Sequence, residues 1–466
     1  MKGRMEADLR SATTALLRPG SIAIVGASED PTLPGGELLH SLVEDRYPGP
    51  IYPVIEPNPG ATRKQTQVLA RRALHNITQI PDGTDMAVVV LPPQRAAATV
   101  MELVKRGVRA IVVPVPGFAE AHQEGRDLQA RMIDSVRCGG ARLLGPNTLG
   151  IYSRTSKMNL VIGVDPTPEG IEATKTPRIA MLSQAGELDQ VFIDSLVRHR
   201  EALSLYVSLG NAADVGFEHL LRGAAEEPGV AAVAMMPSGE IDVPAVASAV
   251  REVSGRVPVL VAPKVRGVAA HRAAKAHVGG ATDAQDAMPS LVAAGAIAAR
   301  DIEDLADRTV AVVNQPMARG RRVAVLSTSG GAAVAAASHL TDLGMEVPPL
   351  SPDVQGVIRS WLPDHAGSSN PVNITGSLPS NNYWPIVSGV LGQPIIDGAV
   401  VLVVGADPPA LAKTIVEAQR RRDKPVVGVT VGAPSTEAAL VDAGIPVYPT
   451  PARAARAYQA LVPIPL

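Results

Sequence analysis

Aromatic residues and cysteine are both scarce in this sequence of 466 residues. Phe, Trp and Tyr make up 3% of the chain although apolar residues make up 46%, so Ala, Val, Leu and Ile must form most of the core, as in layered α/β proteins. The single cysteine, Cys138, excludes an internal disulfide framework and any multi-cysteine zinc site. We expect Cys138 to be a small core residue.

Long apolar runs and an excess of one charge are missing too. No uncharged apolar stretch reaches the roughly 18 residues that a membrane span needs, and Glu6, Asp8 and Arg10 interrupt any signal-peptide core. The 43 basic and 45 acidic residues nearly cancel, and no Lys/Arg run interleaved with aromatics indicates a nucleic-acid surface. We therefore predict a soluble, cytoplasmic protein that binds neither nucleic acid nor membrane.

Three catalytic signatures are absent from the sequence. It has no H-E-x-x-H, no G-x-x-x-x-G-K-[ST] and no G-x-S-x-G motif, which leaves zinc protease, Walker-type ATPase and α/β-hydrolase functions without support. We predict no metal site in the chain. The missing phosphate-loop lysine means that the chain has no ATP site of its own by motif.

Short β-branched runs alternate with amphipathic segments in the first third of the chain. Strands that are apolar on both faces, separated by helix-like stretches such as residues 94–108, are typical of a parallel sheet covered by helices on both sides. The strand-like runs are residues 21–28, 50–55, 85–93, 109–118 and 141–147. We predict a doubly wound, Rossmann-like domain over residues 1–150, ending at the punctuation of "GPNTLG".

The remainder of the chain contains a repeat. "RIAMLSQAGELDQVFIDSL" at 178–196 aligns without gaps with "RVAVLSTSGGAAVAAASHL" at 322–340, and each reads as strand, Ser-rich turn with a glycine, and helix. A second pair, 257–267 and 424–434, follows in the same order. We predict two related α/β domains at about 151–315 and 318–466, joined by "NQPMARGRR" at 314–322.

The stretch "IAIVGASEDPTLPGG" has the strand, glycine turn and helix of a nucleotide-binding first βα unit. In such a unit a glycine lets the backbone approach a phosphate, and the helix N-terminus supplies N–H donors. A generic tight turn explains the motif equally well. The second glycine of G-x-G-x-x-G is missing, which counts against dinucleotide binding, whereas Glu56 after the second strand keeps that interpretation open.

Two later stretches, "MLSQAGELD" at 181–189 and "LSTSGGAA" at 326–333, place hydroxyl and small residues where a helix begins. Ser183 can cap that helix, and the backbone amides together with the helix dipole would form a site for a dianion. Ordinary capping explains either stretch alone. The two together, with a histidine on a glycine loop elsewhere, favour phosphate chemistry.

That histidine is His277, in "AAKAHVGGATD" at 273–283. Its small neighbours leave the ring reachable and the loop free to move. Neutral imidazole is a competent phosphoryl acceptor near pH 7, since its unperturbed pKa is about 6.5. The alternative is that His277 is an ordinary core or surface histidine. His271, beside Arg272, is a second candidate acceptor, but its charged neighbour favours a solvent-exposed position on a helix.

Taken in series, these motifs resemble the NDP-forming acyl-CoA synthetases, the succinyl-CoA synthetase superfamily that includes ADP-forming acetyl-CoA synthetases. The segments that carry the resemblance are "IAIVGAS", "YPVIEPN", "VPGFAEAHQEG", "RLLGPNTLG", "MLSQAGELD", "SLGNAADV", "AHVGG", "STSGGAAV" and "NPVNITG". They span essentially the whole chain. The resemblance implies an α-type subunit with a Rossmann-like CoA-binding domain followed by two flavodoxin-like domains of the succinyl-CoA synthetase type.

The resemblance also implies the roles of individual residues. His277 matches the phosphorylated histidine, and Glu240 is the carboxylate nearest to the glutamate that supports it, because the preceding strand ends at Pro237. The phosphate-binding turn that it implies consists of Ser183, Gln184, Ala185 and Gly186. The implied CoA-binding residues are Gly26, Ala27, Ser28, Asn58, Pro92, Pro93 and Asn147, of which Asn58 stands where the family commonly has a lysine. Asn211 and Asp214 match positions around the CoA thiol and the phosphohistidine.

The implied activity is the interconversion of a small carboxylic acid, CoA and NTP with acyl-CoA, NDP and phosphate. It would proceed through an acyl phosphate and a phosphohistidine. ATP or ADP with Mg²⁺ would bind to a separate ATP-grasp partner of β type, and the assembly would be an oligomer. The alternatives are a CoA- or acyl-CoA-binding module without ligase activity and an NAD(P)-linked oxidoreductase that uses the first domain alone.

Overall fold

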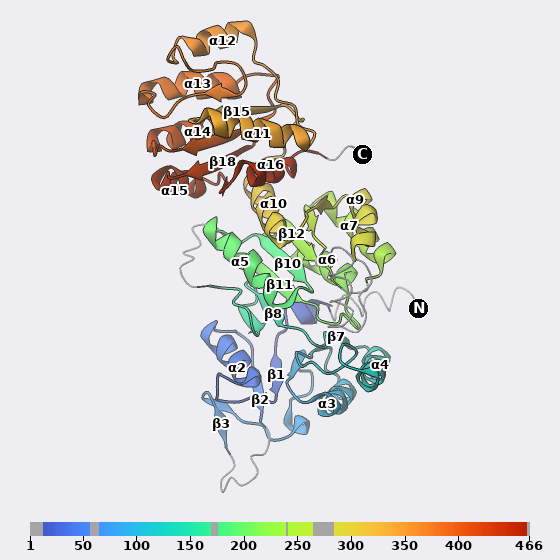
Figure 1. Cartoon of the computed structure of the whole chain (residues 1–466). Coiled ribbons are helices and arrows are strands. Elements are labelled where there is room, and N and C mark those ends of the chain that lie inside the picture. The colour runs from blue at the N-terminus through green and yellow to red at the C-terminus, as the bar shows by residue number, and fades with distance from the viewer. Residues whose placement is uncertain (1–12, 56–64, 169–175, 239–240, 264–283, 464–466) are drawn as a thin grey trace. The chain divides into compact units, whose positions relative to one another are not determined.

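The computed structural model describes residues 13–55, 65–168, 176–238, 241–263 and 284–463. It separates into two compact units, the first made of residues 1–170, 176–193 and 202–302, the second of 171–175, 194–201 and 303–466. Figure 1 labels the elements of both units. Each unit is built from parallel sheets with helices packed against them, so the α/β architecture expected from the alternating runs is confirmed.

The first sheet has the strand order β2-β1-β5-β6-β7, with all neighbours parallel. Its strands are β1 (Ile22–Val25), β2 (Ile51–Val54), β5 (Met86–Val89), β6 (Ala110–Val112) and β7 (Arg142–Leu144), each inside one of the five predicted runs. The accompanying elements are α2 (Pro34–Glu44), α3 (Pro93–Lys105), α4 (Gln123–Cys138), η1 (Ile77–Gln79) and the small ladder of β3 (Gln67–Val68) and β4 (Arg71–Arg72).

Alternate residues of these strands pack on opposite faces of the first sheet, as the two-residue period of a strand requires. Ile22 and Ile24 of β1 share a core with α2, whereas Ala23 and Val25 share one with α3 and α4. Figure 1 shows α2 on one side of β1 and β2, with α3 and α4 on the other. Both faces are therefore buried, which explains the uninterrupted apolar runs.

The second sheet also lies in the first unit and has the order β14-β13-β12-β10-β11-β8-β9. Its strands are β8 (Gly150–Ser153), β9 (Met158–Val161), β10 (Ile179–Ser183), β11 (Leu203–Ser208), β12 (Ala232–Met236), β13 (Val259–Val261) and β14 (Ile297–Ala298). The helical elements between them are η2 (Gly186–Leu188), α5 (Asp189–Arg198), α6 (Phe217–Glu226), α7 (Val243–Ser254) and α9 (Ala284–Ala293). The β8–β9 hairpin pairs antiparallel with β11 and extends one edge of this parallel sheet.

The second unit contains a sheet of order β16-β15-β17-β18-β19, all parallel. The strands are β15 (Val323–Ser327), β16 (Val372–Asn373), β17 (Gly398–Val404), β18 (Val426–Val431) and β19 (Val447–Tyr448). Its helical elements are α10 (Ile302–Asn314), α11 (Gly330–Asp342), α12 (Pro352–Arg359), η3 (Ser380–Asn382), α13 (Tyr383–Leu391), α14 (Pro409–Arg422), α15 (Pro434–Asp442) and α16 (Pro451–Gln459). Helices α11 and α16 cover one face of the sheet, and α13, α14 and α15 cover the other.

The gapless alignment of residues 178–196 with 322–340 is matched by two equivalent units, β10-turn-α5 and β15-turn-α11. In each sheet the strand before the turn lies between the two strands that follow it in the chain. Strand β10 lies between β11 and β12, and β15 lies between β16 and β17. The order in which successive strands are added to the sheet therefore reverses there, although all of these strands are parallel. Ligands of open α/β sheets bind outside the carboxyl ends of the strands at such a point. The predicted domain boundaries at 150 and 315–318 stay predictions.

Buried ion pairs fix α10 against α16 in the second unit. Both oxygens of Asp307 accept from the Arg453 guanidinium at 2.7 Å, and Asp304 bonds Arg308 and Arg456 at 3.1 Å each. Both aspartates are at most 2% exposed, so each needs its cationic partners to offset the cost of burying a charge.

The expectation that Cys138 lies in the core is wrong, because its thiol is exposed. Helix α4 buries Met132, Ile133 and Val136. Cys138 follows Val136 by two residues, about 200° around the helix, and so faces the opposite way. Within the described residues, no helix combines the length and the apolar character that crossing a membrane requires.

Candidate active site

The turn after β1 has the backbone shape that was predicted for it. Gly26 has φ +93°, and a Cβ at this position would lie 2.3 Å from the carbonyl oxygen of Val90. The N–H groups of Gly26 and Ala27, however, both donate to Val54 O, at 2.9 and 3.1 Å. These two residues therefore shape the turn and have no N–H left for a phosphate, whereas the hydroxyl of Ser28, which accepts from Asp30 N at 3.0 Å, can still donate.

Pro92 and Pro93 stand where β5 ends and α3 begins, as the N-cap and the first helical residue. The loop after β6 packs directly on them, since a Cβ on Gly117 would lie 2.6 Å from Cγ of Pro93. Gly117 has φ +106° and cannot be replaced without strain. The carboxyl ends of β1, β5 and β6 thus form one continuous rim, where this sheet would bind its ligand.

Asn147 occupies a left-handed conformation, with φ +58°, in the loop after β7. Its Nδ2 faces Oδ1 of Asn211 at 3.5 Å, and the N–H of Asn211 donates to Pro146 O at 2.9 Å. A Cβ on Gly210 would lie 2.4 Å from Asn147 O, so the two loops meet backbone to backbone. The predicted CoA residue Asn147 is therefore in contact with the loop that follows β11.

The turn at Ser183–Gly186 differs from the predicted helix cap. Ser183 is fully buried, its Oγ accepts from Ala185 N at 2.9 Å and donates to Asp189 Oδ1 at 2.6 Å, and it makes no capping bond to the helix. The N–H groups of Gly186 and Glu187 find no partner within the described residues. Gly186 has φ +69°, and a Cβ there would meet nothing within 4 Å, so this end of the turn is open to a ligand.

Gln184 ties the turn to its neighbours. Its Nε2 donates to Gly210 O at 3.0 Å, its Oε1 accepts from Ser238 N at 3.2 Å, and Ser238 Oγ donates to Gln184 O at 3.0 Å. The loops after β10, β11 and β12 are thereby held together at the carboxyl edge of the second sheet. Gln184 has a positioning role, and the group that remains for an anion is the backbone of Gly186 and Glu187.

Sequence reasoning missed the carboxylate beneath this turn. Asp189, the first residue of α5, is fully buried and accepts from Ser183 Oγ and, at 2.7 Å, from the Tyr206 hydroxyl. Burial, followed by the charge of Asp189, raises the pKa of Tyr206 well above its usual value, so Tyr206 stays a donor. An aspartate among the apolar residues that start a helix was the signal in the sequence.

Glu120 was missed as well, although it stands in the quoted "VPGFAEAHQEG". Its Oε1 accepts from the N–H groups of Gly117 and Phe118, at 2.5 and 3.0 Å, and its Oε2 accepts from Asn211 Nδ2 at 2.5 Å. Asn211 Nδ2 also donates to Gln129 Oε1 at 3.0 Å. Burial works against the charged form of Glu120, but the hydrogen bonds from Asn211 and the two N–H groups outweigh it and lower the pKa.

Asp214, which the resemblance places around the CoA thiol and the phosphohistidine, contributes to the framework of the first unit. It is buried and accepts from Arg137 Nε at 2.9 Å, from Arg142 at 3.3 Å and from Leu143 N at 3.0 Å. Its oxygens are thus fully engaged in joining the loop after β11 to β7.

The structure brings most of the predicted residues of the first unit together. Hydrogen bonds and close packing connect Pro93 to the Gly117 loop, that loop to Asn211 through Glu120, and Asn211 and Gly210 to Asn147 and Gln184. His277, Glu240 and Asn58 lie outside the described residues, so their predicted roles stay predictions. No group of three or more His, Cys, Asp or Glu within the described ranges is placed to hold a metal ion.

The equivalent turn after β15 in the second unit is more open. Ser329 caps α11 by accepting from Ala332 N at 3.5 Å, and Ser327 Oγ accepts from Ser329 N at 3.0 Å. Gly331 has nothing within 4 Å of a built Cβ, and no acidic residue stands in the first turn of α11. The backbone N–H groups and the helix dipole at the start of α11 could therefore attract an anion, and no carboxylate in the first turn of the helix would repel it.

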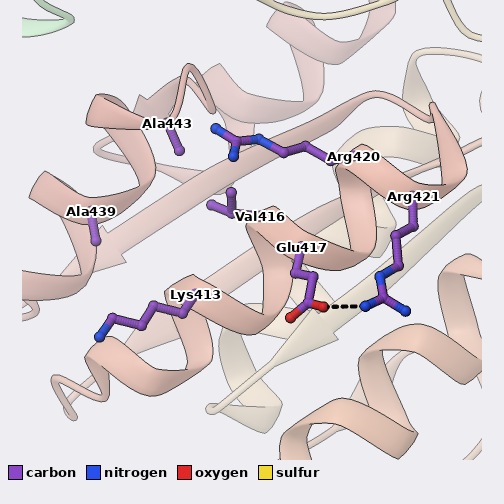
Figure 2. A pocket seen from close by; sticks show the side chains of 7 residues that line it. All are labelled: Lys413, Val416, Glu417, Arg420, Arg421, Ala439 and Ala443. Atoms are coloured by element: carbon purple, nitrogen blue, oxygen red, sulfur yellow. Dashed lines mark hydrogen bonds and ion pairs between the residues drawn. The ribbon is translucent and has the colours of Figure 1, made fainter.

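A groove of about 430 Å³ lies between α14 and α15 of the second unit, as Figure 2 shows. It is lined by Lys413, Val416, Glu417, Arg420, Arg421, Ala439 and Ala443. Glu417 pairs with Arg421, whose guanidinium lies 4.7 Å from the ring centre of Trp384. None of the predicted site residues lines the groove.

Three family models match the chain, one after another. They are a CoA binding domain at residues 20–154, a succinyl-CoA ligase like flavodoxin domain at 176–312, and a ligase-CoA domain at 323–458. The first contains the rim formed by Gly26, Pro93 and Gly117, and the second contains the Ser183 turn. The third contains the turn at Ser327.

The relatives of the chain are CoA ligases. It is 27% identical over 458 residues to the acetate–CoA ligase [ADP-forming] I subunit alpha of Pyrococcus furiosus, covering 96% of each chain. It is 29% identical to the trans-feruloyl-CoA synthase FCS1 of an unknown prokaryotic organism, with 95% of this chain and 63% of that protein covered.

Among solved structures, the chain resembles acetyl-coenzyme A synthetase 1 of Candidatus Korarchaeum cryptofilum in complex with phosphate and ADP. The TM-score is 0.85 at 28% identity, and 97% of this chain and 96% of that chain are covered.

Proposed function

We propose that this chain, which three successive family models make a member of the NDP-forming acyl-CoA synthetases, is the α-type subunit of an acid–CoA ligase. The observation that carries the proposal is the convergence of three loops in the first unit. The Gly117 loop of the CoA-binding domain meets the Asn147 loop and the Ser183 turn through Asn211 and Glu120. A thioester held by the first domain would thus lie next to an anion held by the second.

The proposed reaction begins with attack of an oxygen of inorganic phosphate on the thioester carbonyl. The C–S bond breaks, CoA leaves as the thiolate and takes up a proton, and an acyl phosphate remains. The N–H groups of Gly186 and Glu187 would stabilise its phosphoryl oxygens. Hydrogen bonds from N–H groups at a helix N-terminus become stronger as negative charge develops on the oxygens that accept them. Ser183 and Gln184 would not contact the acyl phosphate themselves; their hydrogen bonds would hold the turn in place.

The phosphoryl group would then pass to His277. A ring nitrogen attacks phosphorus, the bond from phosphorus to the acyl oxygen breaks, and the carboxylate is released. Glu240 would support the imidazole. From His277 the phosphoryl group would pass to the nucleotide, which would bind to another chain.

The partner would be an ATP-grasp subunit of β type that holds ADP and Mg²⁺. Support for a partner comes from the relative that is matched nearly end to end and bears the name of a subunit, and support for ADP from the solved neighbour's complex. CoA would bind along the rim of the first sheet, with Ser28, Pro92, Pro93 and Asn147 in contact with it and Asn58 nearby. The whole assembly would be an oligomer.

A CoA-binding module without ligase activity is the second candidate. The observation that favours it is that the N–H of Ala185, in the phosphate-binding turn, already donates to Ser183 Oγ and so is not available to a phosphate. It predicts binding of CoA with no turnover of any thioester.

The test uses the protein with inorganic phosphate and a panel of acetyl-, succinyl- and feruloyl-CoA, followed by chromatography of CoA, acyl phosphate and free acid. The wild type is expected to convert at least one thioester to CoA and acid. His277→Ala is expected to release CoA and accumulate acyl phosphate, because only the second step needs the histidine, whereas the neighbouring His271→Ala behaves as the wild type. Free acid from His277→Ala at the wild-type rate, or no CoA release by the wild type, would overturn the proposal.

A further inference from the structure

Glu120 joins the loop after β6 to the loop after β11. One carboxylate oxygen accepts from Gly117 N and Phe118 N, and the other accepts from Asn211 Nδ2. The two loops belong to different sheets of the same unit. Glu120 therefore helps to set their spacing, together with Gln129, whose Oε1 accepts from Asn211 Nδ2 at 3.0 Å and from Ala119 N at 3.5 Å.

Each loop is itself fixed to one half of the candidate site. Gly117 packs against Pro93 at the rim of the CoA-binding domain. Asn211 adjoins Gly210, whose carbonyl accepts from Gln184 of the phosphate-binding turn at 3.0 Å. Moving Glu120 would hence move the CoA rim relative to the turn at Gly186, without touching either end directly.

We propose that Glu120 and Asn211 form a latch, in which Glu120 is a positioning residue that holds the acyl-CoA thioester at attack distance from the phosphate. The inference rests on the proposed function and adds to it a residue whose side chain contacts neither substrate. Reacting atoms need a separation of about 3–3.5 Å, and a misplacement of about 1 Å can reduce a rate about 100-fold. The latch therefore acts on the rate of the chemical step more than on the affinity for CoA.

The donor and acceptor pattern of the latch allows a compensating exchange. In Glu120→Gln the amide oxygen stays with the two backbone N–H groups, so the new NH₂ faces the NH₂ of Asn211 and two donors oppose each other. In Asn211→Asp two carboxylates face each other. In the double variant the amide introduced at position 120 donates to the carboxylate introduced at position 211, and the hydrogen bond is restored with its direction reversed.

The experiment measures, for the wild type and each variant, the single-turnover rate of CoA release from acyl-CoA with phosphate and the Kd for CoA by calorimetry. CoA is quantified by chromatography, because the exposed Cys138 would react with a thiol reagent. Glu102→Gln, on a glutamate that pairs with Lys105 on the surface of α3, is the matched control. Thermal unfolding of each variant reports on folding.

We expect Glu120→Gln and Asn211→Asp to reduce the rate about 10- to 100-fold, with the Kd for CoA changed less than about threefold, and the double variant to recover most of the rate. Single variants as fast as Glu102→Gln, or a double variant as slow as the singles at an unchanged melting temperature, would overturn the latch. These outcomes differ from a failure of the proposed function, in which the wild type itself releases no CoA.

Discussion

The turns after β10 and β15 begin alike and then diverge. In both, a buried serine at the end of the strand accepts from the N–H two residues later, Ser183 from Ala185 at 2.9 Å and Ser327 from Ser329 at 3.0 Å. Six residues after the serine, the first turn has the buried Asp189 and the second has Ala333. The same local motif is thus found in two different turns. The carboxylate of Asp189 stabilises the first turn, and the side chain of Ser329, which caps α11, stabilises the second.

The two copies of the motif thus share the strand and the hydrogen bond of its last serine, but neither the backbone conformation that follows, since Gly186 has φ +69° and the aligned Gly330 has no positive φ, nor the contacts that stabilise it. Asp189 engages both Ser183 and Tyr206, so the first turn depends on residues that are distant in sequence. Ser329 caps α11 locally. The first turn should therefore respond strongly to single substitutions, and the second weakly.

The largest expected effect comes from Asp189→Ala, which gives the first turn the residue of the second. We expect a loss of about 3–5 kcal/mol in the free energy of unfolding, because hydrogen bonds to a charged group contribute about 1.5–3 kcal/mol each and two buried hydroxyls lose their acceptor. Urea unfolding measures it. The control is Ser329→Ala, for which loss of the cap costs about 1 kcal/mol. Equal losses for both variants would contradict the comparison.

Tyr206→Phe removes one of the two hydrogen bonds to Asp189, so we expect a loss of about 1.5–3 kcal/mol near neutral pH, about half of that for Asp189→Ala. Because burial raises the pKa of Tyr206 in the folded state, its contribution is complete below the unfolded value of about 10 and is lost as the pH rises above it. The variant should therefore lose less stability than the wild type between pH 10 and 11, as seen in unfolding midpoints measured at each pH. Parallel pH profiles would count against a buried, un-ionised Tyr206.

A smaller effect is expected from Gly186→Ala. Its φ of +69° costs an L-residue about 1–2 kcal/mol, although a Cβ has room there. Gly330→Ala, at the aligned position of the second turn, has ordinary backbone angles and only the Nδ2 of Asn373 at 3.9 Å, so it should be neutral or stabilising by up to about 1 kcal/mol. Opposite signs of the two changes in melting temperature support the comparison, and the same sign would refute it.

The strands and the repeat could be predicted because they depend on short-range patterns. All five runs of the first domain contain a strand of the first sheet, since buried parallel strands are apolar throughout. The β8–β9 hairpin was not predicted, because its two short strands lie outside the repeated pattern of strand, turn and helix. The prediction that Cys138 lies in the core was wrong because it rested on residue type alone. The position of a residue around the helix decides whether it faces the core or solvent, and Cys138 faces solvent.

The candidate site was predictable only in part. Gly26, Pro93, Asn147 and the Ser183 turn could be named from their motifs, but the bonds that connect them could not. Glu120 and Asn211 are 91 residues apart, and nothing local marks them as partners. The same holds for Asp189 and Tyr206, whose pairing depends on how β11 lies beside β10.

If this chain transfers a phosphoryl group through His277, that residue must be phosphorylated during the reaction. The most direct measurement is peptide mass spectrometry, under conditions that preserve acid-labile bonds, after incubation of the protein with inorganic phosphate and the acyl-CoA that it turns over. We expect a single phosphoryl group, on the peptide that contains residues 273–283, and its loss on mild acid treatment. A phosphoryl group on another residue, or none while CoA and free acid are formed, would contradict it.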